Sequence, residues 1–285
     1  MPWPVKIVLK IMLGLLIVLG ALFVLNFHFQ NFPWCKYVSI RDDSRENPLK
    51  IVQITDIHYN TTFPPVIDDM IKKVNKENPD IVVFTGDFVT YPGKLSPKFI
   101  SKMKQIKGKK YCVFGNHDSF DRKKALKDMG MESVSGKFIS LGNNWYLSGV
   151  DFEKPVNVGK SFKNPSYEKL KELLIKQPGN CIYLYHCPQD ILKYKIKDYV
   201  MKDKKTLFLC GHTHGGQIVF PWEKKYNFIL TREAAIKKLG IDFLSESAKA
   251  MAGKVYICGG IGSGNIRFRY GAKPEIYVYK IEPLK

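Results

Sequence analysis

The sequence predicts an α/β domain preceded by one apolar helix that is long enough to cross a membrane. From residue 50 onward, short apolar runs rich in β-branched residues alternate with lysine-rich stretches of helical periodicity. This pattern is typical of a sheet covered by helices on both faces. The 285 residues are 45% hydrophobic, which is enough for one large core. Residues 11–35 contain no Lys, Arg, Asp or Glu, as a membrane-crossing helix requires.

The N-terminal segment, residues 1–30, is expected to be a single-pass membrane anchor. A cleaved signal peptide is the alternative, but no A-x-A-like cleavage site follows the apolar run. Basic residues are nearly balanced on the two flanks, so the charge rule leaves the orientation open. Residues 31–49 are expected to be a short polar linker. An aromatic cluster typical of the membrane interface lies around this boundary: Phe27, Phe29, Phe32 and Trp34.

The following domain, residues 50–285, is expected to contain six buried strands and at least four helices. The continuous apolar runs predict the strands, and the amphipathic, lysine-rich stretches predict the helices. The strands are expected at 51–55, 81–85, 111–114, 181–185, 206–210 and 255–258, and the helices at 66–77, 97–106, 121–129 and 166–176.

The composition favours anionic partners without identifying one. Lys and Arg number 45 against 26 Asp and Glu, for a net charge of +19, and the excess is lysine. A lysine-rich proteome would give the same balance. Nucleic acid is not the favoured partner, because no arginine cluster with interleaved aromatic residues is present. The six cysteines form no C-x-x-C pair and are expected to be buried thiols.

Polar residues of one narrow chemical type follow five of the predicted strands. Ligand sites of open α/β sheets form at the carboxyl ends of strands, so these residues should converge. Each turn alone has an ordinary explanation, such as a helix cap or a hydrogen-bonded core histidine, but five in a row are not expected from turn propensity. The five blocks are Asp56-x-His58, Gly86-Asp87, Gly115-Asn116-His117-Asp118, His186 and Gly211-His212-x-His214.

These five blocks, in this order, resemble the calcineurin-like metallophosphoesterases. The similarity covers residues 50–281 and includes two later features, the glycine-rich run 259–264 and the Arg267-x-Arg269-x-Gly271 segment. Those later features are similar to a branch of membrane-attached or exported bacterial phosphoesterases. The resemblance implies the fold of that family, a sandwich of central β-sheets flanked by helices.

The resemblance also implies a catalytic centre with two divalent metal ions, for which Mn²⁺ is favoured by analogy over Zn²⁺ or Fe²⁺. Asp87 would bridge the two ions. His117 would contact the phosphate and protonate the leaving group, while Asp118 would either orient the imidazole of His117 or cap a helix. The remaining ligands would be Asp56, His58 and His214 for one ion and Asn116, His186 and His212 for the other.

Other reaction classes lack the residues that they need. The sequence has no G-x-S-x-G elbow, Walker loop, H-E-x-x-H helix or tetracysteine zinc pattern. The glycine run 259–264 departs from a dinucleotide loop, because Asn265 stands where the last glycine of G-x-G-x-x-G would fall. A hydrolase that cuts a phosphodiester or pyrophosphate bond is therefore the expected activity.

The substrate is expected to be linked to a lipid, since the domain follows a membrane anchor. Residues 221–253 form an apolar insertion that is either a packed lobe or a lid, in which Trp222 and Phe228 would take up an acyl chain. Arg267 and Arg269 are further candidate substrate contacts. Within the resembling family one such substrate is UDP-2,3-diacylglucosamine, an intermediate of lipid A synthesis, which would require the domain to face the cytoplasm.

Two alternatives stay open at this point. The first is an envelope phosphodiesterase that acts on another phospholipid, a cell-wall polymer or a nucleotide. The second is a metal-binding scaffold that has lost turnover, against which the presence of His117 argues. The sequence does not predict an oligomeric state.

Overall fold

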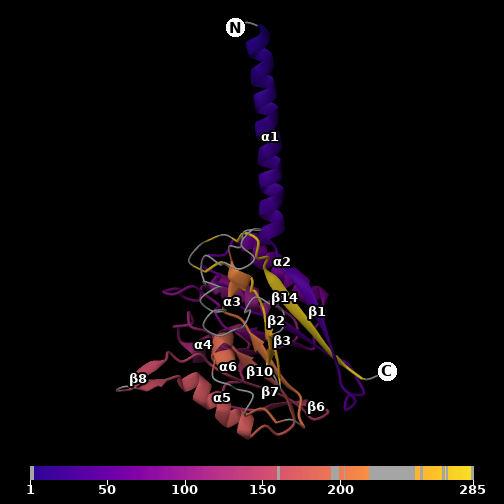
Figure 1. Cartoon of the computed structure of the whole chain (residues 1–285), viewed down its shortest axis with the longest axis vertical. Coiled ribbons are helices and arrows are strands. Elements are labelled where there is room, and N and C mark those ends of the chain that lie inside the picture. The colour runs from indigo at the N-terminus through magenta and orange to yellow at the C-terminus, as the bar shows by residue number, and fades with distance from the viewer. Residues whose placement is uncertain are drawn as a thin grey trace.

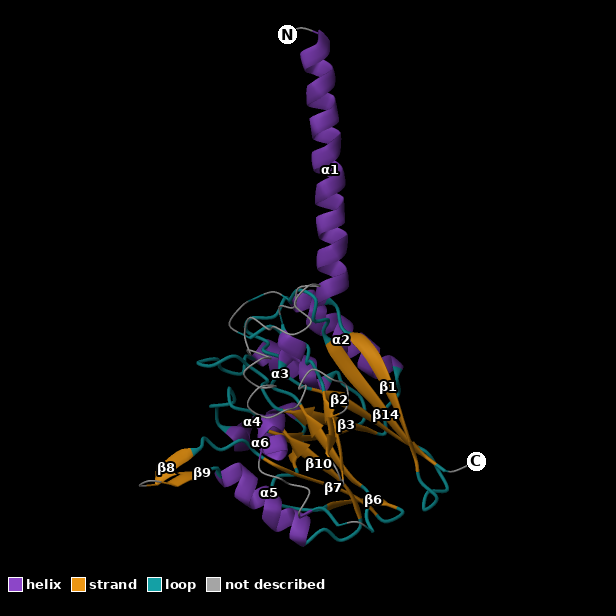
Figure 2. Cartoon of the chain, in the orientation of Figure 1, coloured by secondary structure: helices purple, strands orange, loops and turns teal. Residues whose placement is uncertain are grey.

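The computed structural model describes residues 3–158, 161–193, 199–201, 203–217, 248–250, 253–264, 267 and 269–283. Within these residues the protein consists of a long N-terminal helix and an α/β domain, as the sequence predicts (Figure 1). The domain is a sandwich of two six-stranded sheets, with a two-stranded hairpin formed by β8 (Val156–Val158) and β9 (Ser161–Lys163). Its helices lie outside the two sheets (Figure 2).

The first helix, α1 (Trp3–Asn31), projects away from the domain (Figure 1). Its segment Trp3–Ala21 is long and apolar enough to cross a membrane, with a mean hydropathy of 2.1 and no buried part. Large apolar side chains on this segment, such as Leu13 and Leu16, are about 60% exposed. By length and composition, α1 therefore qualifies as a membrane span.

The first sheet has the strand order β1-β14-β2-β3-β4-β5. All neighbours run parallel except β14 and β2, which run antiparallel. The strands are β1 (Trp34–Arg41), β2 (Leu49–Ile54), β3 (Ile81–Thr85), β4 (Lys109–Val113), β5 (Glu132–Ser133) and β14 (Glu275–Glu282).

The expectation of a linker at residues 31–49 is therefore wrong in part. The chain between Trp34 and Arg41 is an edge strand, paired with β14 along its whole length. Its side chains alternate, with Val38 and Ile40 packed between the sheets and Cys35 against the opposite face. This alternation is the period of a strand with one face on a core, and the charged residues that interrupt it conceal the pattern.

The second sheet has the strand order β12-β13-β11-β10-β7-β6. Its central strands β13, β11, β10 and β7 run parallel to one another, and β12 and β6 are antiparallel edges. The strands are β6 (Ile139–Gly142), β7 (Trp145–Val150), β10 (Asn180–Tyr185), β11 (Thr206–Cys210), β12 (Ala248–Ala250) and β13 (Gly253–Ile257).

Three apolar clusters hold the layers together. One lies between the two sheets and includes Ile51, Val113, Trp145 and Leu184. A second packs the outer face of the first sheet against α2 (Pro64–Lys76), α3 (Pro97–Lys104) and α4 (Arg122–Met129). A third packs the outer face of the second sheet against α5 (Pro165–Ile175) and α6 (Pro188–Lys193). Because both faces of each sheet are covered, the central strands are apolar throughout.

The carboxyl ends of the strands in the two sheets meet at one edge. Backbone hydrogen bonds join the turns that follow them, from Asp56 N to Gly86 O (3.0 Å) and from Gly211 N to His186 O (3.1 Å). A buried side-chain bond from Gln53 Nε2 to Cys210 O (3.0 Å) links the sheets just below this edge. The edge is the place where the strand-end residues come together.

The end of α1 lies at the same edge. Only two residues separate α1 from β1, and Trp34 N donates to Pro274 O at 2.9 Å. Glu275, which pairs with Trp34, donates its N–H to Gly260 O (2.9 Å), and Gly262 N in turn donates to Asp56 O (2.6 Å). A short chain of backbone contacts therefore connects α1 to the first of the strand-end aspartates.

Candidate metal centre

The seven expected metal ligands all lie in turns at this edge, and the structure brings them together. Asp56 and His58 follow β2, Asp87 follows β3 and Asn116 follows β4, so four come from the first sheet. His186 follows β10, and His212 and His214 follow β11, so three come from the second sheet. The site therefore depends on how the two sheets pack against each other.

The backbone at these turns is strained. Asp56, His58, Asp87, His212 and His214 have positive φ angles between 43° and 71°. Residues with a Cβ enter this left-handed region at a cost of about 1 kcal/mol or more. Five of the nine described non-glycine residues with positive φ are thus candidate ligands. Strain of this kind persists only where the surroundings fix it, which is typical of functional sites.

Two glycines make room for the Asp56 side chain. A Cβ on Gly260 would lie 2.6 Å from the Cβ of Asp56. A Cβ on Gly211 would overlap the Asp56 carboxylate and the Thr55 hydroxyl. These close approaches explain why glycine follows β11 immediately before His212, where any side chain would push Asp56 out of place.

We call Asp56, His58 and His214 the first ligand group. His58 Nε2 and His214 Nε2 are 3.2 Å apart, and Asp56 Oδ1 lies 3.9 Å and 3.5 Å from them. Asp56 Oδ1 is buried and has no hydrogen-bond partner in the described part of the chain. Burial raises the pKa of Asp56 to about 6, so at neutral pH its carboxylate is mostly ionised while Oδ1 has no hydrogen-bond donor among the described residues.

The far nitrogens of the two imidazoles fix their tautomers. His58 Nδ1 lies 2.8 Å from Thr90 Oγ1, and His214 Nδ1 lies 3.2 Å from Gly262 O. Arg269 Nη2 also lies 3.2 Å from His214 Nδ1, but it donates to Gly259 O and Gly262 O. We therefore assign the proton of each ring to Nδ1, which leaves both Nε2 lone pairs turned toward Asp56. Burial lowers the pKa of His58 to about 3 and also lowers that of His214. Two lone pairs and a carboxylate oxygen that face one another fit a cation.

We call Asn116, His186 and His212 the second ligand group. His186 Nε2 lies 2.9 Å from Asn116 Oδ1 and 3.3 Å from His212 Nδ1. His186 Nδ1 donates to Thr85 O at 2.7 Å, which turns Nε2 toward the site. Burial lowers the pKa of His212 to about 3. For His186 burial acts in the same direction, but the carboxylates of Asp87 and Asp56 outweigh it and raise the pKa to about 10.

Asp87 lies between the two groups. Its Oδ2 is 3.5 Å from His58 Nε2 and 3.3 Å from His186 Nε2, while its Oδ1 accepts the N–H of His117 at 2.9 Å. Burial would raise the pKa of Asp87, but His186 and His58 outweigh it and lower the pKa below its usual value. An ionised carboxylate that faces both groups has the position needed for a bridging ligand.

His117 lies at the mouth of the site, half-buried, with its ring 5.0 Å from that of His58. Its Nδ1 accepts the backbone N–H of Tyr91 at 3.0 Å. A neutral imidazole whose Nδ1 accepts a hydrogen bond carries its proton on Nε2. The turn after β3 thus fixes the tautomer of a side chain from the turn after β4.

Asp118 differs from both roles expected for it. Its carboxylate is buried and accepts three backbone N–H bonds, from Asp87 (2.8 Å), Phe88 (2.9 Å) and Gly115 (2.8 Å). It neither contacts the imidazole of His117 nor caps a helix. Burial and the charge of Asp87 raise its pKa to about 7. Asp118 instead holds together the two turns that carry Asp87 and Asn116.

The two expected arginine contacts are placed differently. Arg267 is exposed, as a substrate contact would be. Arg269 is 2% exposed, and its guanidinium donates to His214 O (3.0 Å), Gly259 O (2.7 Å) and Gly262 O (2.9 Å). Since these carbonyls occupy its donors, Arg269 joins the turn of His214 to the loop beside Asp56. Trp222, Phe228 and most of the insertion 221–253 lie outside the described residues.

Three contributors to the site carry no signal in the sequence. Thr90 orients His58 through its hydroxyl, Tyr91 orients His117 through its backbone, and Gly262 orients His214 through its carbonyl. Two of these act through the main chain, where residue type gives no information. Only Thr90 offers a side chain, and a threonine five residues after the end of a strand is common in any protein.

The chain belongs to the calcineurin-like phosphoesterase family. The family model matches residues 49–216, more than half of the chain, and this segment holds all seven candidate ligands. The resemblance inferred from the five strand-end blocks is therefore confirmed, and with it the α/β fold of the family. The activity that follows is that of a metal-dependent hydrolase of phosphate esters.

Among curated relatives, an uncharacterized metallophosphoesterase of Campylobacter jejuni is 25% identical over 289 residues, 98% of this chain and 72% of that protein. The uncharacterized metallophosphoesterase YkuE of Bacillus subtilis is 28% identical over 244 residues, 82% of this chain and 79% of that protein. The UDP-2,3-diacylglucosamine pyrophosphatase LpxG of Chlamydia trachomatis is 26% identical over 286 residues, 80% of this chain and 82% of that protein.

Proposed function

We propose that this protein is a membrane-anchored phosphoesterase that holds two divalent metal ions, one at each ligand group, with Asp87 shared between them. The observation that carries the proposal is the geometry of the first ligand group, where two neutral imidazoles face a buried carboxylate oxygen that has no hydrogen-bond partner in the described part of the chain. Mixed nitrogen and oxygen donors suit Mn²⁺, Fe²⁺ and Zn²⁺. Mn²⁺ is our first choice by family analogy.

When bound, two divalent ions at these groups supply positive charge that stabilises the phosphoryl group and activates water. The chain itself supplies the proton for the leaving group. Because Tyr91 N–H donates to Nδ1 of His117, the imidazole carries its proton on Nε2. We assign to this N–H the hydrogen bond to the phosphate and the protonation of the departing oxygen. Asp118 stabilises this geometry because its carboxylate joins the turn of Asp87 to the turn that carries Asn116 and His117.

We further propose that the substrate is a lipid-linked phosphodiester or pyrophosphate in the membrane that α1 crosses. The catalytic edge of the two sheets and the end of α1 lie on the same side of the domain, joined through Trp34, Glu275 and Gly260. A substrate held in the bilayer would thus approach the domain at the edge where the candidate ligands lie. The similarity to LpxG supports UDP-2,3-diacylglucosamine as the specific substrate, with the domain on the cytoplasmic face.

Turnover assays with a defined substrate panel test this proposal. The full chain, reconstituted in nanodiscs with Mn²⁺, Zn²⁺ or Fe²⁺, would be given UDP-2,3-diacylglucosamine and soluble diesters such as bis-p-nitrophenyl phosphate. We expect release of UMP from the lipid substrate at a higher kcat/KM than hydrolysis of any soluble diester. Hydrolysis of soluble diesters alone would contradict the lipid-linked substrate while retaining the phosphoesterase activity.

The orientation of the anchor distinguishes the leading substrate from the alternative. A topology reporter fused to the carboxyl terminus should report a cytoplasmic domain. A domain on the outer side of the membrane would exclude a nucleotide-linked lipid made in the cytoplasm. That result would favour an envelope phosphodiesterase acting on another phospholipid or a cell-wall polymer.

A further inference from the structure

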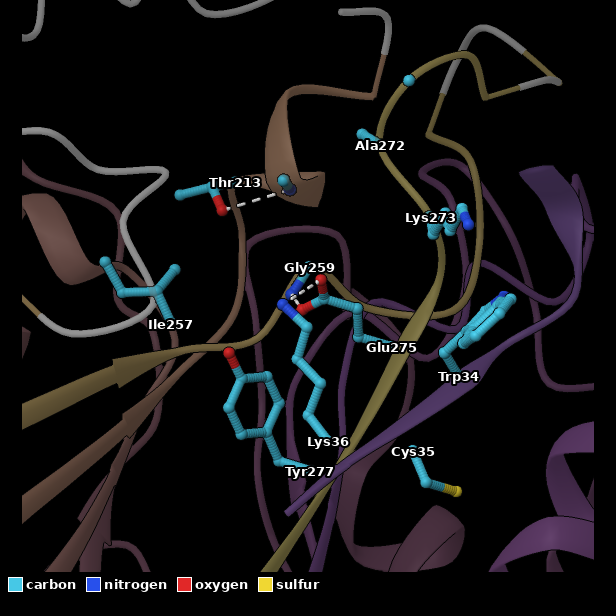
Figure 3. A pocket seen from close by; sticks show the side chains of 12 residues that line it. Trp34, Cys35, Lys36, Thr213, Ile257, Gly259, Ala272, Lys273, Glu275 and Tyr277 are labelled. Carbon is cyan, nitrogen blue, oxygen red and sulfur yellow. Dashed lines mark hydrogen bonds and ion pairs between the residues drawn. The ribbon is translucent and has the colours of Figure 1, made fainter. Parts of the chain in front are cut away.

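A second concave surface lies beside the metal centre, on the far side of the turn that carries His212 and His214. This cavity, which we call the β1 cavity, has a volume of about 360 Å³ and is formed where β1 and β14 approach the ends of β11 and β13. Figure 3 shows Thr213, Ile257 and Gly259 on one side of it and Trp34 and Lys273 on the other. None of the seven candidate ligands lines it.

The length of α1 places this cavity at the level of lipid headgroups. The helix has 29 residues, which at 1.5 Å per residue span about 44 Å. A bilayer with its headgroups is about 40 to 45 Å thick. Because Trp34 follows α1 after only two residues, a helix that crosses the whole bilayer leaves Trp34 at the boundary between headgroups and water. Trp34 is 48% exposed there, as is typical of interfacial tryptophan.

The charges around the cavity favour an anion. Lys36 and Lys273 line it, and its single carboxylate, Glu275, is already held by Lys36 Nζ (2.7 Å) and by Gly259 N (3.2 Å). Lys273 is exposed, and its ammonium lies 4.3 Å from the centre of the Trp34 ring. Lys273 has no ion pair with any residue that the structure describes. Its charge is therefore available to a ligand.

A second groove continues the same surface across β1. It has a volume of about 380 Å³, shares Trp34 and Cys35 with the β1 cavity, and adds Lys73 and Lys76 from the end of α2. Lys73 donates to Pro33 O and pairs with Asp69, both at 2.7 Å or less. Lysines thus lie on both sides of the first residues of β1, directly below the membrane helix.

We propose that the β1 cavity binds the phosphate-bearing headgroup of an anionic phospholipid from the bilayer that α1 crosses. Lys273 contacts the phosphate, Lys36 stays in its pair with Glu275 beside it, and the Trp34 ring contacts the glycerol and the first methylene groups. The bound headgroup lies against Thr213, between His212 and His214 in the sequence, so the lipid contacts the turn that carries two candidate ligands. This inference rests on the membrane anchor proposed above but not on the identity of the substrate.

Binding of short-chain lipids to the full chain tests the inference. In detergent, the protein would be titrated with dihexanoyl phosphatidylglycerol or dihexanoyl phosphatidylcholine, and bound lipid counted by native mass spectrometry. We expect the anionic lipid to bind more tightly, and Lys273→Ala to weaken it about fivefold, the contribution of one lysine near an anionic surface. Lys273→Arg should retain the preference, because it retains the charge.

The matched control is Lys104→Ala, which removes an exposed lysine of α3 that lines neither cavity. It should leave lipid binding unchanged, and thermal unfolding of each variant shows whether it is folded. Equal binding of the two lipids, or undiminished binding by Lys273→Ala, would overturn the inference. Glycerol 1-phosphate that binds as tightly as the lipid would assign the cavity to a soluble phosphate and reject the bilayer as its source.

The assay measures binding without turnover. A negative result would therefore leave metal-dependent hydrolysis intact, and a protein that hydrolyses no ester could still bind the lipid. The two proposals fail separately.

Discussion

The two ligand groups of the metal centre are built from similar side chains but differ in burial and in protonation. The first group is enclosed: Asp56 and His58 are fully buried, and both of its imidazoles are neutral because burial lowers their pKa. The second group is open: Asn116 is exposed, and the carboxylates near His186 hold a proton on its imidazole. The first group thus lacks only a cation, whereas the second must lose a proton before it can accept one.

This difference predicts two metal sites of unequal affinity. A ligand set that is already oriented and deprotonated loses little on binding an ion, while displacement of a proton makes binding weaker and dependent on pH. We expect the first group to retain its ion under mild chelation and the second to lose its ion first. Stepwise removal by a chelator, followed by metal analysis of the dialysed protein, would show two separate losses.

The largest effect is expected from Asp87→Ala. This change removes the one carboxylate that faces both groups. Both groups should therefore lose their ions, and no difference in metal affinity between them should remain. Loss of a general acid lowers a rate by about 10²- to 10⁴-fold. Activity of Asp87→Ala toward a soluble diester should fall by more than this. Metal content measured by mass spectrometry checks the cause. Retention of both ions by the variant would contradict the bridging position assigned to Asp87.

The next largest effect is expected from His117→Ala, which removes none of the seven candidate ligands. Activity should fall about 10²- to 10⁴-fold because the leaving oxygen loses its proton donor, while both ions stay bound. The loss should be smaller for a diester whose leaving group is a good nitrophenolate than for one with an alkoxide. An equal loss for the two leaving groups would argue against proton donation.

Thr90→Ala should affect the first group alone. Removing the hydroxyl that holds Nδ1 of His58 frees the ring, and such changes cost about 10- to 100-fold in metal affinity. Thr90→Ser restores the hydroxyl and should restore the affinity. If the variant lost the more weakly held ion instead, the assignment of the tighter site to the first group would be wrong.

The smallest effect, counted for each pH unit, is that of pH on the second group. Because the pKa of His186 is raised to about 10, a proton must leave before an ion binds at neutral pH. Affinity for the second ion should therefore rise about tenfold for each pH unit between pH 6 and pH 9. The first ion should show a shallower dependence over this range. Metal titrations at several pH values, with activity as the readout, test whether the two slopes differ.

The same contrast shows what the sequence predicts and what it leaves open. The strand-end ligands are visible because Asp, His and Asn are the residues that bind metals and because apolar strands precede them. The inequality of the two groups is not visible, since it arises from the burial of His58 and from the approach of Asp87 and Asp56 to His186. The spacing of residues along the chain predicts neither the burial of His58 nor the distances from the carboxylates to His186.

The departures from the sequence-based expectations have a common cause. Asp118 binds backbone amides of its own turn and of the turn after β3, and Arg269 binds carbonyls of the His214 turn and of the loop 259–262. Main-chain donors and acceptors are the same for every residue type, so no pattern identifies them in advance. The strand β1 was concealed for a related reason: it is an edge strand whose partner, β14, lies more than 200 residues later in the chain.

The two-residue connection between α1 and β1 also limits how far the catalytic edge can move relative to α1. Because β1 pairs with β14 along its whole length, the domain cannot swing far on so short a connection, and under the anchored arrangement proposed above the catalytic edge would stay at a nearly constant distance from the lipid surface. Encounters with the proposed lipid-linked substrate would then take place in two dimensions, and the quantity that governs the rate would be the number of substrate molecules per unit area of bilayer. Diluting the substrate with inert lipid should slow turnover even when its amount per volume is unchanged.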